Sequence, residues 1–322
     1  MTETLRAGVI GVGSMGRNHA RVYRELAGVE LTGVADLDDH AAERVAVEYG
    51  TTAYETPDLL REVDLVSVAV PTQAHAPVVE QCIAAGVHAL VEKPFVTDVD
   101  VGRDLAERAA EENVVLQVGH VERFNPAVRT LAKVAADLDV IAVDALRLGP
   151  PVDREIGSNV VYDLMIHDLD VVRSMLGEPP ASVSAFMTAD GDYATANCEF
   201  GDDTLATFTA SRVTQQKVRR LGITARECRV LVDYIDQSVE IHRAAAPAYV
   251  EEGGDLRHTT ESVIERPLVE SGEPLKIELG AFADAVRDGT SPLVTAEDGL
   301  RAVELAHCVV AAADADPERV VR

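Results

Sequence analysis

Short apolar stretches alternate with amphipathic stretches through the first 119 residues, and this alternation restricts the fold more than any other feature. The apolar stretches that predict strands are residues 6–10, 30–35, 64–70, 87–91 and 114–118. The segments between them have apolar residues at helical spacing. Repeated strand–helix–strand units of this length predict a parallel, doubly wound sheet.

A glycine-rich turn lies between the first predicted strand and the first predicted helix. Its sequence is G-V-G-S-M-G at residues 11–16. In such a turn Gly11 makes the tight bend, Gly13 lets a pyrophosphate approach the backbone, and Gly16 lets the helix pack closely on the strand. The free N–H groups at the helix start attract phosphates. The turn, with Ser14 and Met15, is therefore the predicted dinucleotide site of a Rossmann domain.

Asp36 ends the second predicted strand, twenty residues after Gly16. A carboxylate at this place accepts hydrogen bonds from the adenine ribose hydroxyls. It would repel a 2′-phosphate, and no arginine follows directly, because the next residues are Leu37, Asp38 and Asp39. We therefore expect NAD rather than NADP. The alternative interpretation is an ordinary turn followed by a helix-capping aspartate.

Two further segments contain residues suited to catalysis. Glu92 and Lys93 lie at the carboxyl end of a predicted parallel strand, the edge where open sheets bind ligands, in a chain with only four lysines. Asp163 and His167 are four residues apart, so on a helix they share a face, and a carboxylate orients a nearby imidazole. By spacing alone, a surface ion pair and a helical ion pair fit these segments as well.

Beyond residue 119 the pattern changes to consecutive strands. Ala194, Ala196, Cys198 and Phe200 alternate along one predicted strand, and strands at 205–210 and 229–232 follow without helices between them. This predicts an α+β domain whose mainly antiparallel sheet has one covered face. Residues 120–294 are the predicted substrate-binding domain, and 295–322 a C-terminal helix. Thr295 and Asp298 have the spacing of a capping box at its start.

The charge balance excludes some partners. Asp and Glu total 55 against 29 Lys and Arg, a formal charge of -26. Such a chain should bind neither nucleic acid nor an anionic membrane. The acidic excess with few lysines is similar to that of halophilic proteins, so we expect a salt-rich cytoplasm.

The cysteines and histidines indicate neither disulfides nor a metal site. The four cysteines are widely spaced, which is typical of buried thiols in a reducing cytoplasm. We expect no bound metal, no membrane span and no signal peptide.

Four segments together resemble the glucose–fructose oxidoreductase / inositol dehydrogenase / MocA family. They are GVIGVGSMGRNHA, VDLVSVAVPTQAH, GVHALVEKPF and DLMIHDLD, and the resemblance covers essentially the whole chain. It implies that Lys93 and His167 flank a reacting carbinol with Asp163 beside them. It also implies that the final helix returns to the Rossmann domain, and that the open sheet face forms a homodimer or homotetramer.

The chemistry implied by the resemblance is oxidation of a secondary alcohol. A hydride passes to the nicotinamide while the hydroxyl proton leaves to a base. His167 is a candidate for that base, and Lys93 for polarising the oxygen. Which of the two accepts the proton stays open.

The same resemblance assigns further binding residues. Pro71, Thr72, His75 and Glu92 are expected at the nicotinamide ribose, although His75 also fits a polar residue at a helix start. Arg123 and Asn125 are expected to hold the substrate. For Asn125, capping of the next helix is an equal alternative.

The segments GHVERFNP and DLMIHDLD are most similar to the subgroup acting on nucleotide sugars, typified by UDP-N-acetylglucosamine 3-dehydrogenases. Arg123 would suit a diphosphate. Dehydrogenases of free sugars or inositol are the near alternative. The third hypothesis is a regulator that binds the dinucleotide without turnover.

Overall fold

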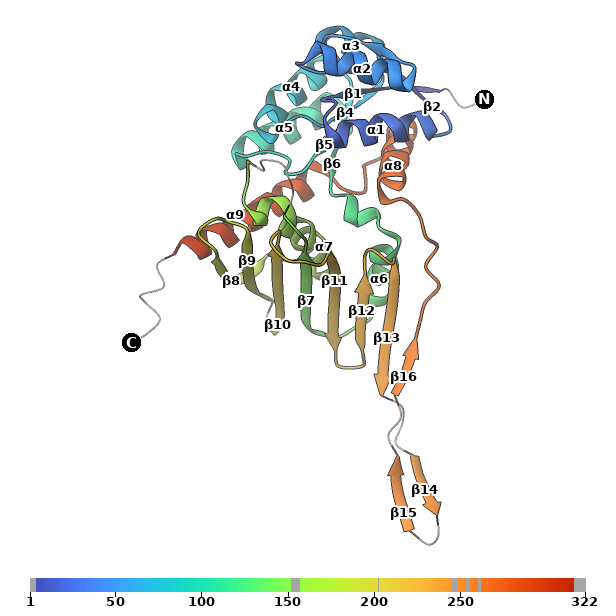
Figure 1. Ribbon diagram of the computed structural model, residues 1–322, viewed down its shortest axis with the longest axis vertical. Coiled ribbons are helices and arrows are strands. Elements are labelled where there is room, and N and C mark those ends of the chain that lie inside the picture. The colour runs from blue at the N-terminus through green and yellow to red at the C-terminus, as the bar shows by residue number, and fades with distance from the viewer. Residues whose placement is uncertain are drawn as a thin grey trace. The chain divides into compact units, whose positions relative to one another are not determined.

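The chain folds into two compact units (Figure 1). The computed structural model describes residues 4–151, 157–201, 203–244, 248–252, 255–259 and 262–315. Unit 1 comprises residues 1–124 and 272–304, and unit 2 comprises residues 125–271 and 305–322.

Unit 1 contains the predicted parallel sheet. Its six strands are β1 (Leu5–Ile10), β2 (Val29–Ala35), β3 (Thr52–Ala53), β4 (Leu65–Val68), β5 (His88–Glu92) and β6 (Leu116–Gly119). The spatial order is β3-β2-β1-β4-β5-β6, and every neighbouring pair is parallel. The predicted doubly wound fold is confirmed.

Helices cover both faces of this sheet. They are α1 (Ser14–Glu25), α2 (Asp39–Tyr49), α3 (Thr56–Glu62), η1 (Thr72–Ala74), α4 (His75–Ala85), α5 (Val99–Glu111), η2 (Val121–Phe124) and α8 (Pro274–Asp288). One core cluster joins the sheet to α3, α4 and α5, and the other joins it to α1, α2 and α8. Local signals set the helix ends: Asp38 and Asp98 cap α2 and α5 with their carboxylates, and Gly50 and Gly86 end α2 and α4 in the left-handed region.

The unit boundaries differ from the predicted domain boundaries of 119 and 294. The first unit extends to residue 124, and it also contains residues 272–304, so it includes α8. The physical reason is burial, because Leu275, Leu279 and Phe282 of α8 pack in the same cluster as Tyr23 of α1. The last helix, α9 (Ala296–Asp314), begins in unit 1, where Leu300 packs with the core.

Unit 2 contains an eight-stranded sheet. Its strands are β7 (Val140–Leu148), β8 (Pro180–Met187), β9 (Tyr193–Phe200), β10 (Thr204–Ser211), β11 (Val218–Ala225), β12 (Arg229–Asp233), β13 (Ser238–Ala244) and β16 (Ser262–Glu265). The order is β16-β13-β12-β11-β7-β10-β9-β8, and only the β7–β10 pair among them is parallel. A separate two-stranded sheet pairs β14 (Ala248–Glu252) with β15 (Asp255–Thr259).

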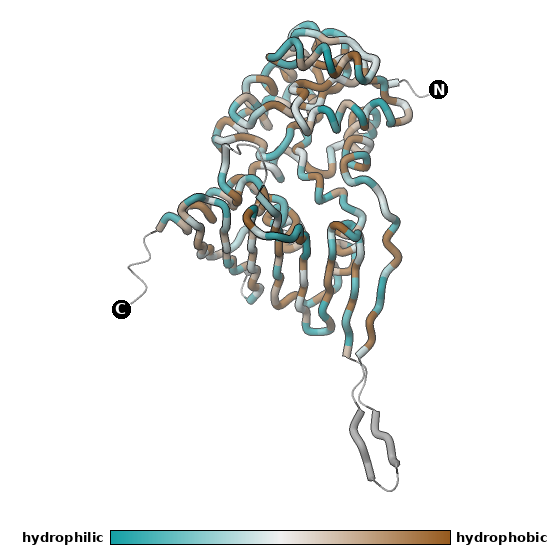
Figure 2. Tube along the Cα trace, viewed as in Figure 1, coloured by the Kyte–Doolittle hydropathy of each residue, from teal (hydrophilic) through white to brown (hydrophobic). Residues whose placement is uncertain are grey.

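One face of the eight-stranded sheet is covered by helices. They are α6 (Pro126–Ala135), the π-helix η3 (Val161–Met165) and α7 (Ile166–Leu176). Figure 2 shows hydrophobic and hydrophilic residues alternating along these strands, and on β9 Ala194, Ala196, Cys198 and Phe200 are buried as predicted. Within the described residues, no helix is both long and apolar enough to cross a membrane.

Candidate active site

The three glycines of the 11–16 turn meet different surroundings at the carboxyl end of β1. A Cβ on Gly11, whose φ is +89°, would lie 2.7 Å from the Ala69 carbonyl oxygen. A Cβ on Gly16 would lie 1.8 Å from the carbonyl oxygen of Gly11. A Cβ on Gly13 would have no heavy atom within 4 Å. Gly11 and Gly16 are therefore required by the fold, whereas Gly13 leaves open space where a pyrophosphate would approach.

Asp36 lies beside this turn, as predicted. Its Oδ2 accepts from the Val12 N–H at 2.7 Å, and its Oδ1 accepts from the Asp38 N–H at 3.0 Å. These two bonds hold the carboxylate at the end of β2, next to the glycine turn. The next residue is Leu37, which is uncharged and fully exposed, so no cation directly follows the carboxylate. This geometry fits a ribose with a free 2′-hydroxyl.

Glu92 and Lys93 lie at the carboxyl end of β5, on the same edge of the sheet as the glycine turn. Lys93 is half-buried, and its backbone N–H donates to Glu92 Oε2 at 3.3 Å. Exposed Pro71 and half-buried Thr72 follow β4 at this edge. Glu92, Lys93, Pro71 and Thr72 therefore lie on one sheet edge with the turn.

His75 is placed differently from its neighbours. It is 1% exposed, its Nδ1 lies 3.0 Å from the Pro94 carbonyl oxygen, and its Nε2 lies 3.0 Å from that of Val70. Burial lowers the pKa of His75, although the carbonyls of Phe95, Val70 and Pro94 raise it. The imidazole thus links the segment after β4 to the turn after Lys93 through backbone carbonyls, and it is buried beneath the sheet edge.

A chain of buried side chains lies behind Glu92, and the sequence did not predict it. His19 Nε2 lies 2.9 Å from Glu92 Oε1, and His19 Nδ1 lies 2.8 Å from Ser67 Oγ. Ser67 Oγ is also 2.8 Å from the Tyr23 hydroxyl. A histidine on the apolar face of the first helix was the available signal, but its partners come from β4 and β5.

Of the two predicted substrate residues near residue 120, one is a helix cap. Asn125 is 2% exposed, its Oδ1 accepts from the Ala127 N–H at 3.1 Å, and its Nδ2 donates to the Tyr234 carbonyl at 3.1 Å. The capping alternative therefore describes Asn125 in this structure, and the substrate contact expected of it stays a prediction. Arg123 lies in η2 and is half-buried.

Asp163 and His167 lie in unit 2 on consecutive but different helices. Asp163 belongs to the π-helix η3, and His167 is the second residue of α7. A π-turn contains an extra residue and is common at functional sites, so the spacing of Asp163 and His167 across this turn is not that of a single α-helix. Asp163 Oδ2 lies 3.7 Å from Arg212 Nη1, which also donates to the Ser158 carbonyl at 3.0 Å. Arg212 is a second residue that sequence reasoning missed.

A buried ion pair holds α7 against the sheet. Arg147 on β7 donates from Nε to Asp168 Oδ2 at 2.7 Å and from Nη2 to Asp168 Oδ1 at 2.9 Å. Both side chains are nearly inaccessible, and the Arg147 guanidinium lies over the Tyr234 ring. Because Asp168 directly follows His167, this pair fixes the position of the histidine backbone.

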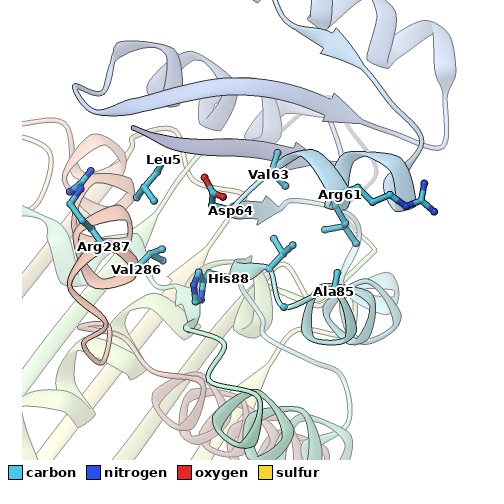
Figure 3. A pocket seen from close by; sticks show the side chains of 11 residues that line it. Leu5, Arg61, Val63, Asp64, Ala85, His88, Val286 and Arg287 are labelled. Atoms are coloured by element: carbon cyan, nitrogen blue, oxygen red, sulfur yellow. The ribbon is translucent and has the colours of Figure 1, made fainter. Parts of the chain in front are cut away.

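A cavity of about 760 Å³ opens at the other end of the unit 1 strands (Figure 3). Leu5, Asp64 and His88, which line it, lie at the amino ends of β1, β4 and β5. Asp64 forms an ion pair with Arg6 at 2.7 Å. This cavity is therefore on the edge opposite the glycine turn. Among the described residues, no group of three or more His, Cys, Asp or Glu is arranged to hold a metal.

Family models match both units. Residues 5–120 match a model described as an oxidoreductase family with an NAD-binding Rossmann fold. Residues 146–232 match the GFO/IDH/MocA C-terminal domain. Together with the glycine turn and Asp36, these matches define an NAD-dependent oxidoreductase. The chain belongs to the glucose–fructose oxidoreductase / inositol dehydrogenase / MocA family, and it is a dehydrogenase.

Named relatives and solved structures are similar over most of the chain. UDP-N-acetylglucosamine 3-dehydrogenase of Acidithiobacillus ferrooxidans is 37% identical over 247 residues, 75% of this chain and 78% of that protein. Its solved structure has a TM-score of 0.87 at 32% identity, covering 96% of this chain and 97% of that chain. Inositol 2-dehydrogenase of Rhizobium meliloti is 28% identical over 324 residues, 95% of this chain and 96% of that protein. GenD2 from gentamicin A biosynthesis, solved in complex with NAD, has a TM-score of 0.81 at 26% identity, covering 98% of this chain and 95% of that chain.

Proposed function

We propose that this dehydrogenase uses NAD to oxidise a secondary alcohol of a nucleotide sugar, in the manner of a UDP-N-acetylglucosamine 3-dehydrogenase. The observation that carries the proposal is the 37% identity to the Acidithiobacillus ferrooxidans enzyme, in a chain that has Lys93, Asp163 and His167 together. Half-buried Arg123 is the proposed partner of the substrate diphosphate, since a guanidinium binds phosphate oxygens in a bidentate way.

In the proposed mechanism, residues of unit 1 hold the cofactor. Gly13 and the start of α1 hold the pyrophosphate, Asp36 holds the adenine ribose, and Glu92, Pro71 and Thr72 contact the nicotinamide ribose. Bound NAD supplies the acceptor for the hydride.

His167 removes the hydroxyl proton of the substrate, and the Lys93 ammonium stabilises the alkoxide as it forms. Asp163 orients His167 and favours the imidazolium that results. The C–H bond breaks with both electrons leaving as hydride, the O–H proton goes to the imidazole, and the product is a ketone.

Oxidation of a free sugar or an inositol is the second candidate. It is favoured by the inositol 2-dehydrogenase of Rhizobium meliloti, which is similar over 95% of this chain although only 28% identical. Both candidates use the same chemistry at Lys93 and His167. They differ in whether a nucleotide is required for binding, which an assay distinguishes directly.

A homodimer or homotetramer formed through the open face of the eight-stranded sheet belongs to the same proposal. The apolar side chains Phe186, Leu146 and Leu205 are exposed on β8, β7 and β10, to 67%, 37% and 58%. The proposed oligomer would cover these side chains.

The experiment is NADH formation in high salt with a substrate panel. The panel contains UDP-sugars, free hexoses and pentoses, and inositols, each with NAD and with NADP. We expect turnover of a UDP-sugar with NAD, and no comparable turnover of the free sugar. Turnover of an inositol or free sugar alone would select the second candidate. Saturable NADH binding without turnover of any panel member would favour a dinucleotide-binding regulator.

A further inference from the structure

A line of four polar side chains runs from α1 through the sheet of unit 1 to Glu92. The contacts are Tyr23 hydroxyl to Ser67 Oγ at 2.8 Å, Ser67 Oγ to His19 Nδ1 at 2.8 Å, and His19 Nε2 to Glu92 Oε1 at 2.9 Å. Tyr23, Ser67 and His19 are each 0% exposed. Each of these buried polar groups would cost free energy if it lost its hydrogen-bond partner, so the four side chains depend on one another.

The direction of the His19–Glu92 hydrogen bond follows from its acceptor. A carboxylate only accepts, so His19 Nε2 donates to Glu92 Oε1. The other ring nitrogen, Nδ1, contacts Ser67 Oγ, and Ser67 Oγ contacts the Tyr23 hydroxyl. Both imidazole nitrogens of His19 are therefore engaged by side chains of unit 1.

Glu92 is held as a carboxylate by its surroundings. Burial raises its pKa, but the hydrogen bond and charge of His19 and the charge of Lys93 outweigh burial, so the pKa of Glu92 lies below its usual value. The titratable groups that face it are His19 from α1, Lys93 directly after β5 and His75 from α4, while Glu278 of α8 faces Tyr23 at the far end of the line. Backbone Gly119 of β6 closes the remaining side, because a Cβ there would lie 3.3 Å from Glu92 Oε2.

We propose that His19 is a positioning residue for the nicotinamide end of the cofactor site, acting by fixing the Glu92 carboxylate beside Lys93. The inference rests on the proposed function, in which Glu92 contacts the nicotinamide ribose. His19 occupies Oε1, so the carboxylate cannot rotate, and Oε2 stays next to the Lys93 backbone. Without the imidazole, Glu92 would lose its only buried hydrogen-bond donor from α1.

Binding of two ligands, ADP and NADH, distinguishes this positioning role from a general disturbance of α1. The glycine turn at the start of α1 and Asp36 serve the adenosine diphosphate part, whereas Glu92 serves the nicotinamide part. The affinity for ADP therefore depends on the glycine turn and Asp36, whereas the affinity for NADH depends on these residues and on Glu92. A positioning role predicts weaker NADH binding with unchanged ADP binding.

The experiment is titration calorimetry of the full chain with NADH and with ADP in high salt. His19→Gln retains a side-chain N–H that reaches the Nε2 position, whereas the shorter His19→Asn reaches only the Nδ1 position. We expect NADH binding to weaken roughly tenfold in His19→Asn and His19→Leu, which is the loss of one hydrogen bond to a charged group. His19→Gln should stay within about threefold of the wild type, and ADP binding should be unchanged in all three.

Tyr23→Phe is the matched control, because it removes the far end of the line and leaves the His19–Glu92 bond. It should bind NADH as the wild type does. Equal weakening of NADH and ADP, or equal NADH binding by the Gln and Asn variants, would overturn the positioning role. A wild-type chain that binds neither ligand would instead refute the proposed cofactor function, and the role of His19 with it.

Discussion

At the scale of single residues, Gly13 and Gly16 allow function and folding to be tested separately. Gly13→Ala adds a Cβ in open space at an ordinary φ of −64°, so the free energy of unfolding should change by less than about 0.5 kcal/mol. NADH binding should weaken at least tenfold, because the methyl group lies where the pyrophosphate approaches. Urea unfolding and NADH titration are the measurements.

Gly16→Ala is the control for that pair. Its Cβ would lie 1.8 Å from the Gly11 carbonyl oxygen, so the turn must shift and the chain should lose about 1–3 kcal/mol of stability. Unchanged NADH binding by Gly13→Ala would contradict the approach of the pyrophosphate to the backbone at Gly13.

The lowered pKa of Glu92 predicts a pH-dependent contribution to stability. A carboxyl group whose pKa is lower in the folded state stabilises the fold above its unfolded pKa of about 4.3, and this contribution is lost as the pH falls through the folded pKa. The unfolding free energy of the wild type should exceed that of Glu92→Gln at neutral pH. The difference should shrink as the pH falls below about 4. A difference that does not depend on pH would contradict a charged Glu92.

At the scale of elements, the Arg147–Asp168 pair should control the stability of α7. Arg147→Met leaves the Asp168 carboxylate buried without its bidentate partner, which should cost about 3–5 kcal/mol in urea unfolding. Turnover should fall too, since α7 carries His167. The double variant Arg147→Met/Asp168→Leu removes both charges and should recover most of the loss. A double variant as unstable as the single one would show that the pair itself contributes the stability.

Elements with local signals were predictable from the sequence, and those defined by their partners were not. The capping box of α9 is present as predicted, because Asp298 Oδ2 accepts from the Thr295 N–H at 3.0 Å and Thr295 Oγ1 accepts from the Asp298 N–H at 3.2 Å. Strand β7 was not predicted, although it lies inside the eight-stranded sheet between β11 and β10. Its alternation is clear only in its burial, because Val143, Ala145 and Arg147 lie on the face that α7 covers.

The residues of the candidate site also differ in whether the sequence could predict them. The glycine turn and Asp36 were predictable because their chemistry depends on spacing within one strand–helix–strand unit. The line behind Glu92 was not, since its partner His19 is 73 residues away in sequence, and His19 meets Glu92 and Ser67 only when α1, β4 and β5 pack together. The π-turn at Asp163 also has no sequence signal, and Arg212 becomes its neighbour only through the fold of unit 2.

At the scale of the whole molecule, the charge of -26 predicts stability that rises with salt. Screening shortens the range of repulsion from about 10 Å at 0.1 M to about 3 Å at 1 M ionic strength. The melting temperature should be higher in about 3 M than in about 0.1 M KCl, with most of the rise below about 1 M, where the long-range repulsion is screened. The exposed ion pairs, such as Arg301–Glu297 at 2.8 Å, weaken in salt but contribute little each. Equal melting temperatures would contradict a halophilic adaptation.

The proposed function requires that this chain move a hydride from a nucleotide-sugar carbinol to NAD. The most direct measurement is mass spectrometry of the NADH formed from UDP-N-acetylglucosamine that carries deuterium at sugar carbon 3. We expect deuterium in the reduced nicotinamide, and we expect the labelled product to be lost in Lys93→Ala while ADP still binds. Unlabelled NADH would place the reaction at another carbon. Labelled NADH at an undiminished rate in Lys93→Ala would contradict the proposed active site.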